Sequence, residues 1–247
     1  MRMTSLNRTL TRESMNERLQ IIFRKYEKEL EGWYENIIHH QQQFIMPYNP
    51  YWEDVREKPL DIEALLHRLL EIFIGYGGKG GTWKITESLD YGTGFRVGIC
   101  SQEIDHAYFL GVDKDSIFLE SPIAHPESIH KMFDRFVQDI ADFSRFGVFN
   151  YLENEVFNDS ILRAHRVLLK KKIKGQLPEL LRNYFIAKAE LDGDFELGFL
   201  EVQWPLNQFS MYQMLTEGCR AFEIIHHLNV ELWKKSKSRK PKTSGGR

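Results

Sequence analysis

Three polar residues in the last third of the chain have types and spacing suited to metal chemistry: Asp192, Glu201 and Gln203. Mg²⁺-dependent cleavage of a phosphodiester requires oxygen ligands that hold the ion at about 2.0–2.1 Å beside the scissile phosphate. An acid at the edge of a strand and a second acid in mid-strand can converge on one ion. A residue two positions later points to the same sheet face and can orient the attacking water. We therefore predict Asp192 and Glu201 as metal ligands, with the carbonyl of Val202 as an extra ligand, and Gln203 as the group that orients water.

This arrangement resembles the PD-(D/E)xK nuclease superfamily, in particular restriction endonucleases whose last lysine is replaced by glutamine. The resemblance implies hydrolysis of a phosphodiester with Mg²⁺ bound by Asp192 and Glu201, and it places Gln203 in the lysine position. Leu191 stands where the family has proline, and Gln203 does not bring the positive charge that lysine supplies to the transition state. The family fold also has a strand after the next helix, where this chain has a basic tail. An Asp–Gly turn that leads into an edge strand is the alternative interpretation.

A second candidate is a cationic segment that contains six basic residues and no acid between positions 163 and 174. With 100° of rotation per residue, four of these residues fall within one arc of about 80° on a helix, and apolar residues gather opposite. The segment is predicted to be an amphipathic helix whose cationic stripe follows a phosphate backbone. An acidic protein partner or a membrane headgroup would fit the same stripe, and so would lysines that only keep a helix soluble. The residues predicted to bind nucleic acid are Arg163, Arg166, Lys170, Lys171 and Lys174.

The net charge of −2 conceals an uneven distribution along the chain. Ten of the 33 Lys and Arg residues lie in residues 1–12 and 234–247, which contain no acid. Residues 13–233 therefore have 23 basic and 35 acidic residues, a sum of −12. Because an acidic body repels polyanions over most of its surface, we expect any nucleic-acid contact to be local. The basic tail is a second candidate contact, with a nuclear address or a solubility tail as alternatives.

Length and composition indicate a globular protein without a membrane span. The 247 residues suffice for one large domain or two small ones, and the 42% of hydrophobic residues exclude a mostly disordered chain. No uncharged apolar stretch approaches the roughly 20 residues that cross a bilayer. Two cysteines form neither a disulfide scaffold nor a zinc-binding spacing, which favours a cytoplasmic protein. The arginine-rich residues 1–13 are expected to be a flexible basic start, with a short transit peptide as the alternative.

The first half of the chain changes from a helical period to a strand period. Apolar residues recur at helical spacing over 14–46 and again over 61–74. Four runs then alternate between apolar and polar residues, with turn residues between them, and they predict an antiparallel meander of about four strands. We expect the amphipathic helix 126–143 to cover one face of this sheet. The four predicted strands are 83–87, 95–99, 106–112 and 116–121.

The second half is predicted to be rich in helices and to contain one further strand. The whole chain therefore belongs to the α+β class, with residues 14–233 as a single domain that has a candidate subdomain boundary near 147–150. Residues 234–247 are expected to be a disordered basic tail. The predicted elements are helices at 150–173, 177–190 and 209–234, and a strand at 194–204.

Two other patterns lack the context that their chemistry requires. The glycine-rich run 75–82 is preceded by a predicted helix and followed by a strand, whereas a Walker loop leads from a strand into a helix. Glu35 and His39, like Glu223 and His227, are four residues apart and share a helix face. Such pairs can build a dimetal centre, but that centre usually has additional glutamates. Partly buried histidines are the alternative.

Two functions from different classes fit these observations. The first is a non-catalytic accessory or binding protein without a cofactor, which contacts nucleic acid or an acidic protein partner through the basic helix and the basic tail. The alternative is a divergent metal-dependent nuclease of PD-(D/E)xK type, in which Asp192, Glu201 and Gln203 act with Mg²⁺ and the basic helix holds the substrate. We favour the first function, because it requires neither the missing lysine nor the missing final strand.

Overall fold

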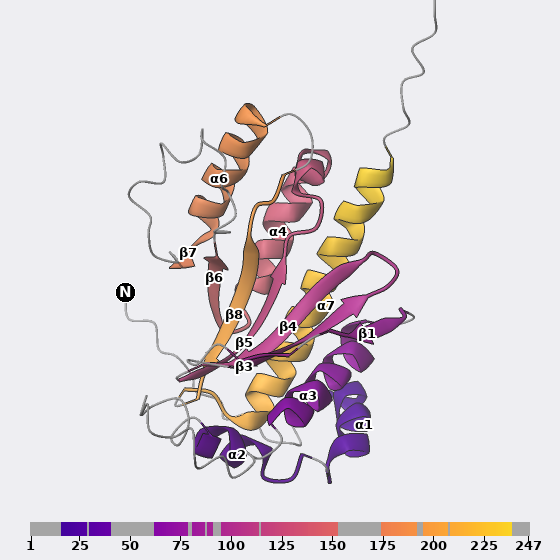
Figure 1. The fold of residues 1–247 in the computed structure, drawn as a ribbon, viewed down its shortest axis with the longest axis vertical. Coiled ribbons are helices and arrows are strands. Elements are labelled where there is room, and N and C mark those ends of the chain that lie inside the picture. Colours follow the sequence, from indigo (N-terminus) through magenta and orange to yellow (C-terminus); the bar gives the residue numbers. More distant parts are fainter. Residues whose placement is uncertain are drawn as a thin grey trace, which may run out of the picture.

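One antiparallel sheet with helices packed on it forms the framework of the protein, so the predicted α+β class is confirmed (Figure 1). Among the described helices, none combines the length and the apolar character that crossing a bilayer requires. The computed structural model describes residues 16–28, 30–40, 62–78, 81–86, 88–90, 95–113, 115–152, 174–191, 195–206 and 208–238.

The sheet has eight strands in the order β1-β3-β4-β5-β8-β6-β7, with β2 paired to β3. The predicted meander is confirmed as β1, β3, β4 and β5, each of which pairs antiparallel with the next. The strand predicted at 194–204 is shorter at its start and becomes β8, which lies between β5 and β6. The strands are β1 (Trp83–Ile85), β2 (Leu89–Asp90), β3 (Phe95–Ser101), β4 (His106–Val112), β5 (Ser116–Pro122), β6 (Val148–Leu152), β7 (Lys174–Gly175) and β8 (Phe199–Pro205).

The helices follow the predicted order with two interruptions. The long helix predicted over 14–46 is divided into two, and Gly32 between them adopts a left-handed φ of 68°. The helix predicted over 126–143 begins as a 3₁₀ turn before its α-helical part. The helical elements are α1 (Glu17–Tyr26), α2 (Trp33–His40), α3 (Ile62–Gly77), η4 (Pro126–Lys131), α4 (Phe133–Phe143), α6 (Leu177–Glu190) and α7 (Met211–Lys237).

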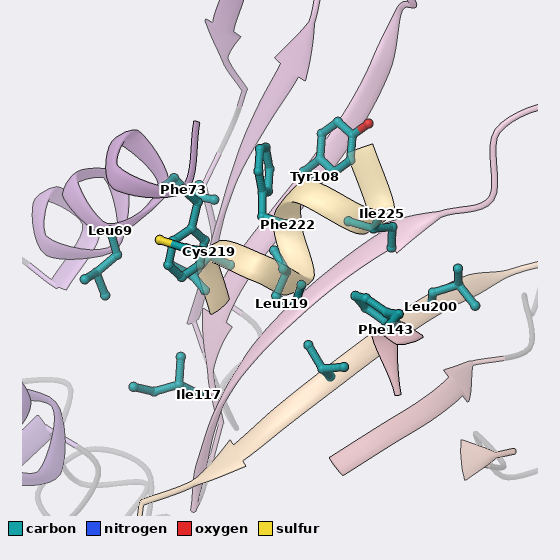
Figure 2. Packing of buried hydrophobic residues seen from close by; sticks show 14 of the residues in the cluster. Leu69, Phe73, Tyr108, Ile117, Leu119, Phe143, Leu200, Cys219, Phe222 and Ile225 are labelled. Carbon is teal, nitrogen blue, oxygen red and sulfur yellow. The ribbon is translucent and has the colours of Figure 1, made fainter. Parts of the chain in front are cut away.

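The core lies between one face of the sheet and the helices α3, α4 and α7. Alternate strand residues point toward these helices, and they include Tyr108, Leu119 and Leu200 (Figure 2). Phe222 of α7 packs there, with its ring centroid 5.2 Å from that of Tyr108. Phe73 of α3 meets the same ring at 6.3 Å, so α7 joins α3 to the sheet. The predicted cover, α4, packs on the same face beside α7, where the ring centroid of Phe143 lies 6.0 Å from that of Phe149 of β6.

Three expectations about the second half were wrong. Residues 150–152 belong to strand β6 rather than to the predicted helix 150–173, because they pair with β8 on one side and β7 on the other. Lys174 lies in β7, opposite Leu152, and therefore does not continue a helical stripe. Helix α7 continues to Lys237, so the first four residues of the predicted disordered tail are helical. Positions 239–247 lie outside the described residues.

Candidate functional site

The second face of the sheet, which points away from α3 and α7, carries a line of polar side chains. Glu120 of β5 and Glu201 of β8 are direct cross-strand partners, and Asn150 of β6 is the next partner of Glu201. Arg96 of β3 approaches from the side: its guanidinium carbon lies 4.6 Å from the ring centroid of Phe109, the cross-strand partner of Glu120. We call Arg96, Glu120, Glu201 and Asn150 the polar row. Strand register and alternation place all four on one face, because Arg96 pairs with Gly111, two residues from Phe109.

The two acids and the amide of the polar row are buried, Arg96 is partly exposed, and the charges have protein partners. Glu120 and Glu201 are each 5% exposed. The Arg96 Nη1 donates a hydrogen bond to Glu120 Oε1, and Asn150 Nδ2 donates to Glu201 Oε1 at 2.9 Å. Carboxylates that lie opposite each other on neighbouring strands repel unless positive charge or hydrogen-bond donors compensate them. The row can therefore hold two acids side by side because a cation and an amide flank them.

Glu201 and Gln203 share this face, as their spacing of two residues predicts. Gln203 is 9% exposed and lies opposite Phe118 of β5 and Val148 of β6. Asp192 lies outside the described residues, so its role as a metal ligand beside Glu201 stays a prediction. The acid that the described structure places beside Glu201 is Glu120, which the spacing argument missed. The sequence shows Glu120 as a charged residue in the middle of a predicted strand, but only the pairing of β5 with β8 shows that Glu201 is its neighbour.

The described part of the chain fits a Mg²⁺ site incompletely. It contains no group of three or more His, Cys, Asp or Glu residues positioned to hold a metal ion. The polar row and Gln203 offer two carboxylates and two amides, and the arginine compensates one of the carboxylates. Mg²⁺ is commonly held by one or two carboxylates together with waters and substrate phosphates. Glu120 and Glu201 would be the ligands of such an ion.

A basic surface gathers at the C-terminal end of α7. Lys131 of η4 reaches this end: its Nζ donates to the Lys235 carbonyl at 2.5 Å and to Ser238 Oγ at 3.4 Å. The Lys237 ammonium lies 3.7 Å from the ring centroid of Trp233. We call Lys131, Lys234, Lys235 and Lys237 the basic end. Of the five residues predicted to bind nucleic acid, four lie outside the described residues: Arg163, Arg166, Lys170 and Lys171. The fifth, Lys174, lies in strand β7 rather than in a helix.

A buried serine–histidine contact joins β4, β5 and α7. The Nε2 atom of His106 lies 3.0 Å from Ser121 Oγ, and Asn229 Nδ2 lies within hydrogen-bond distance of both. Nucleophilic catalysis requires an accessible hydroxyl, but Ser121 is completely buried and also lies close to the Ala107 carbonyl. Burial lowers the pKa of His106 to about 4, so its imidazole is neutral at pH 7. The contact is therefore a structural link between sheet and helix.

Comparison with known proteins adds no relative to this geometry. No family model matches the chain, and the search of curated proteins gave no match.

Proposed function

We propose that the protein is a non-catalytic binding protein that contacts a polyanion, most readily nucleic acid. The observation that supports this most strongly is the basic end, where Lys131 of a separate element joins Lys234, Lys235 and Lys237 on the last turn of α7. The chain continues with Arg239, Lys240 and Lys242, and no acid follows Glu231. Because the body of the protein is acidic, a nucleic acid is attracted where basic residues gather, and the basic end is such a place.

The geometry of the basic end suits nucleic acid beyond its charge. Trp233 is partly exposed, and the Lys237 ammonium lies over its ring. Aromatic rings beside cations stack on bases while the cations contact phosphates. The basic residues Arg163, Arg166, Lys170 and Lys171, which the sequence predicts to bind nucleic acid, provide a second contact in this proposal. An acidic protein partner would use the same charges, but it would not use a base-stacking ring.

The test is fluorescence anisotropy with labelled single-stranded DNA, single-stranded RNA and duplex DNA at low salt. We expect the triple variant Lys234→Gln/Lys235→Gln/Lys237→Gln to bind about tenfold more weakly, because each lysine neutralises phosphate charge. The matched control is Arg24→Gln/Lys25→Gln/Arg145→Gln, which removes the same charge from exposed residues of α1 and the turn after α4. Equal losses in both triple variants would mean that only net charge matters. Absence of binding to every nucleic acid would overturn the proposal.

The second candidate function is Mg²⁺-dependent cleavage of a phosphodiester. The adjacency of Glu120 and Glu201, with Gln203 on the same face, favours it. In this case Glu120 and Glu201 hold the ion and Gln203 orients water, with Asp192 as the further ligand predicted from the sequence. Incubation of labelled nucleic acids with and without Mg²⁺ or Mn²⁺ tests it. Metal-dependent cleavage that Glu201→Gln abolishes and Glu190→Gln, at an exposed residue of α6, preserves would favour the nuclease over the binding protein.

A further inference from the structure

A cavity of about 440 Å³ lies at the ends of strands β4, β5 and β8 and shares no residue with the polar row or the basic end. It is formed by the turn before β4, the segment between β5 and η4, and the chain that leads into β8. A cavity of about 300–1,000 Å³ is the usual size for a small-molecule site. All the residues that line this one are described, and they come from three segments that are distant in sequence.

The inner wall of the cavity is apolar. Ile104, Ile123, Phe195 and Leu197 line it, and all four side chains are buried. Such a wall removes the carbon skeleton of a ligand from water, which contributes roughly 25 cal/mol per Å² of apolar area. The wall alone does not distinguish one apolar ligand from another, so selectivity must come from the polar groups.

Glu127 supplies a buried carboxylate to this cavity. It is 4% exposed, and its Oε1 atom lies 3.3 Å from His125 Nδ1 and accepts a hydrogen bond from Ser128 at 3.5 Å. Both contacts are longer than a strong charge-assisted hydrogen bond. Among the described residues no side chain or backbone group donates a hydrogen bond to the other oxygen, Oε2. Oε2 is not among the fully buried unpaired side-chain atoms of the described chain, so it is accessible from the cavity, where a cation can pair with it.

The lining of the cavity contains acids but no lysine or arginine. Asp105 is an exposed acid of this lining, which also includes His125, the partner of Glu127. The imidazole of His106, also in the lining, is neutral because burial lowers its pKa to about 4. A concave surface with one sign of charge attracts ligands of the opposite sign. Anionic ligands are therefore disfavoured and cationic ones are favoured.

The backbone of the lining is strained at two points. Asp105 and His125 have φ values of 49° and 46°, and they are the two non-glycine residues with positive φ in the described chain. Both line the cavity. Asp tolerates the left-handed region in turns, whereas for His it is less common. Residues in such conformations persist where the surroundings hold them, and they cluster at ligand sites.

We propose that this cavity binds a small organic cation, a primary or secondary amine with an apolar body. The ammonium pairs with the Glu127 carboxylate, and the carbon skeleton packs on Ile123 and Phe195. A bare metal ion fits less well, since the described residues contain no cluster of three metal-ligating side chains and the inner wall is apolar. This site is independent of polyanion binding, because it shares no residue with the basic end.

The test uses phenethylamine as the probe, with the neutral 2-phenylethanol and the anionic 3-phenylpropionate as matched compounds. Titration of the ¹⁵N-labelled full chain should give saturable amide shifts at Ala124, Glu127 and Gly198 with phenethylamine. We expect binding at least tenfold weaker for the alcohol and no binding for the anion, because a hydrogen bond to a charged group is worth about tenfold or more in affinity. Equal binding of the amine and the alcohol would overturn the proposal.

Three variants separate the contribution of the Glu127 carboxylate from that of net charge. Glu127→Gln should weaken phenethylamine at least tenfold and leave 2-phenylethanol unchanged, whereas Glu190→Gln, which removes the same charge from α6, should change neither. Asp105→Asn, which keeps a residue that tolerates positive φ, should weaken the amine about threefold through the field alone. It also serves as the test if thermal melting shows that Glu127→Gln does not fold. Unchanged amine affinity in the folded variants would contradict the site. Nucleic-acid binding measured on the same variants should not change, so failure here and failure of the proposed function remain distinct.

Discussion

The two acids of the polar row are held together by the groups beside them. Glu120 and Glu201 are cross-strand partners and nearly inaccessible, so their charges are weakly screened by water. Arg96 compensates Glu120 and remains partly exposed, while Asn150 donates a hydrogen bond from its neutral amide to Glu201. Removing the arginine leaves two buried carboxylates with less compensation, and this asymmetry can be measured.

We expect Arg96→Met to lower the free energy of unfolding by about 2 kcal/mol, less than for a fully buried pair because the guanidinium is partly exposed. The double variant Arg96→Met/Glu120→Gln should recover at least half of this loss, since a neutral amide needs no counter-charge. Urea unfolding measures both. Arg68→Met breaks a half-exposed ion pair with Glu71 and should cost less than about 0.5 kcal/mol. Equal losses at the two arginines would contradict the role of the row.

His106 makes the fold sensitive to acid. Its pKa is about 4 in the folded protein because the ring is buried, against 6.5 for an exposed histidine. The unfolded chain therefore takes up a proton between these values and the folded chain does not. The free energy of unfolding should have its full value above pH 6.5 and fall by up to about 3 kcal/mol as the pH decreases toward 4.

The variant His106→Gln isolates this contribution. Its free energy of unfolding should change less with pH than that of the unsubstituted protein, by about 1.4 kcal/mol per pH unit at most. Urea unfolding at pH 7.5, 6.5, 5.5 and 4.5 provides the comparison. The same slope in both proteins would rule out His106 as the source.

Helices α3 and α7 approach closely enough that glycine is required at their contact. A Cβ atom on Gly77 would lie 2.7 Å from the Glu223 Cα, a backbone atom that cannot turn aside. On Gly75, in the same helix, a Cβ would meet Ile22 at 3.6 Å, an ordinary contact. The two glycines therefore differ only in what lies opposite them, although alanine favours a helix at both.

We expect Gly77→Ala to destabilise the protein by about 1–3 kcal/mol, as overpacking does in other tightly packed contacts. Gly75→Ala should be neutral or stabilise by up to about 1 kcal/mol through helix propensity. Thermal and urea unfolding of the two single variants decide the matter. A stabilised Gly77→Ala would show that α3 and α7 can separate without cost.

The charge of the protein divides it into an acidic body and basic ends. Residues 13–233 sum to −12, while the C-terminal residues from Lys234 onward have seven basic residues. A polyanion is therefore repelled by most of the surface and attracted at few places, and its affinity depends on ionic strength. The basic end is the part of this distribution for which the structure provides contacts.

Binding to duplex DNA should weaken linearly in a plot of log K against log salt concentration. Each phosphate contact contributes about 0.9 to the slope, so Lys234→Gln/Lys235→Gln/Lys237→Gln should reduce the slope by up to about 3. Anisotropy between roughly 50 and 200 mM salt provides the data. The control triple variant Arg24→Gln/Lys25→Gln/Arg145→Gln should keep the original slope. A slope that does not change in the first variant would place phosphate contact elsewhere on the protein.

Local patterns in the sequence identified most of the described elements. Helices α3, α6 and α7 and strands β3, β4 and β5 have regular apolar periods, and these periods depend only on residues near one another in the chain. The same patterns placed Glu201 and Gln203 on one face of a strand. The sequence prediction was wrong at residues 150–152, which belong to strand β6, because a short apolar run is compatible with either a helix or a strand.

Only the tertiary structure decided which distant residues meet. The insertion of β8 between β5 and β6 brings Glu120 beside Glu201, and the packing of η4 against α7 accompanies a cavity that Glu127 and Asp105 both line. Hydrophobic periodicity specifies which face of an element is buried, but it does not specify which element lies next to it. Strand order and cavity shape arise from long-range pairing and packing, so the neighbours of each acid became known only from the folded chain.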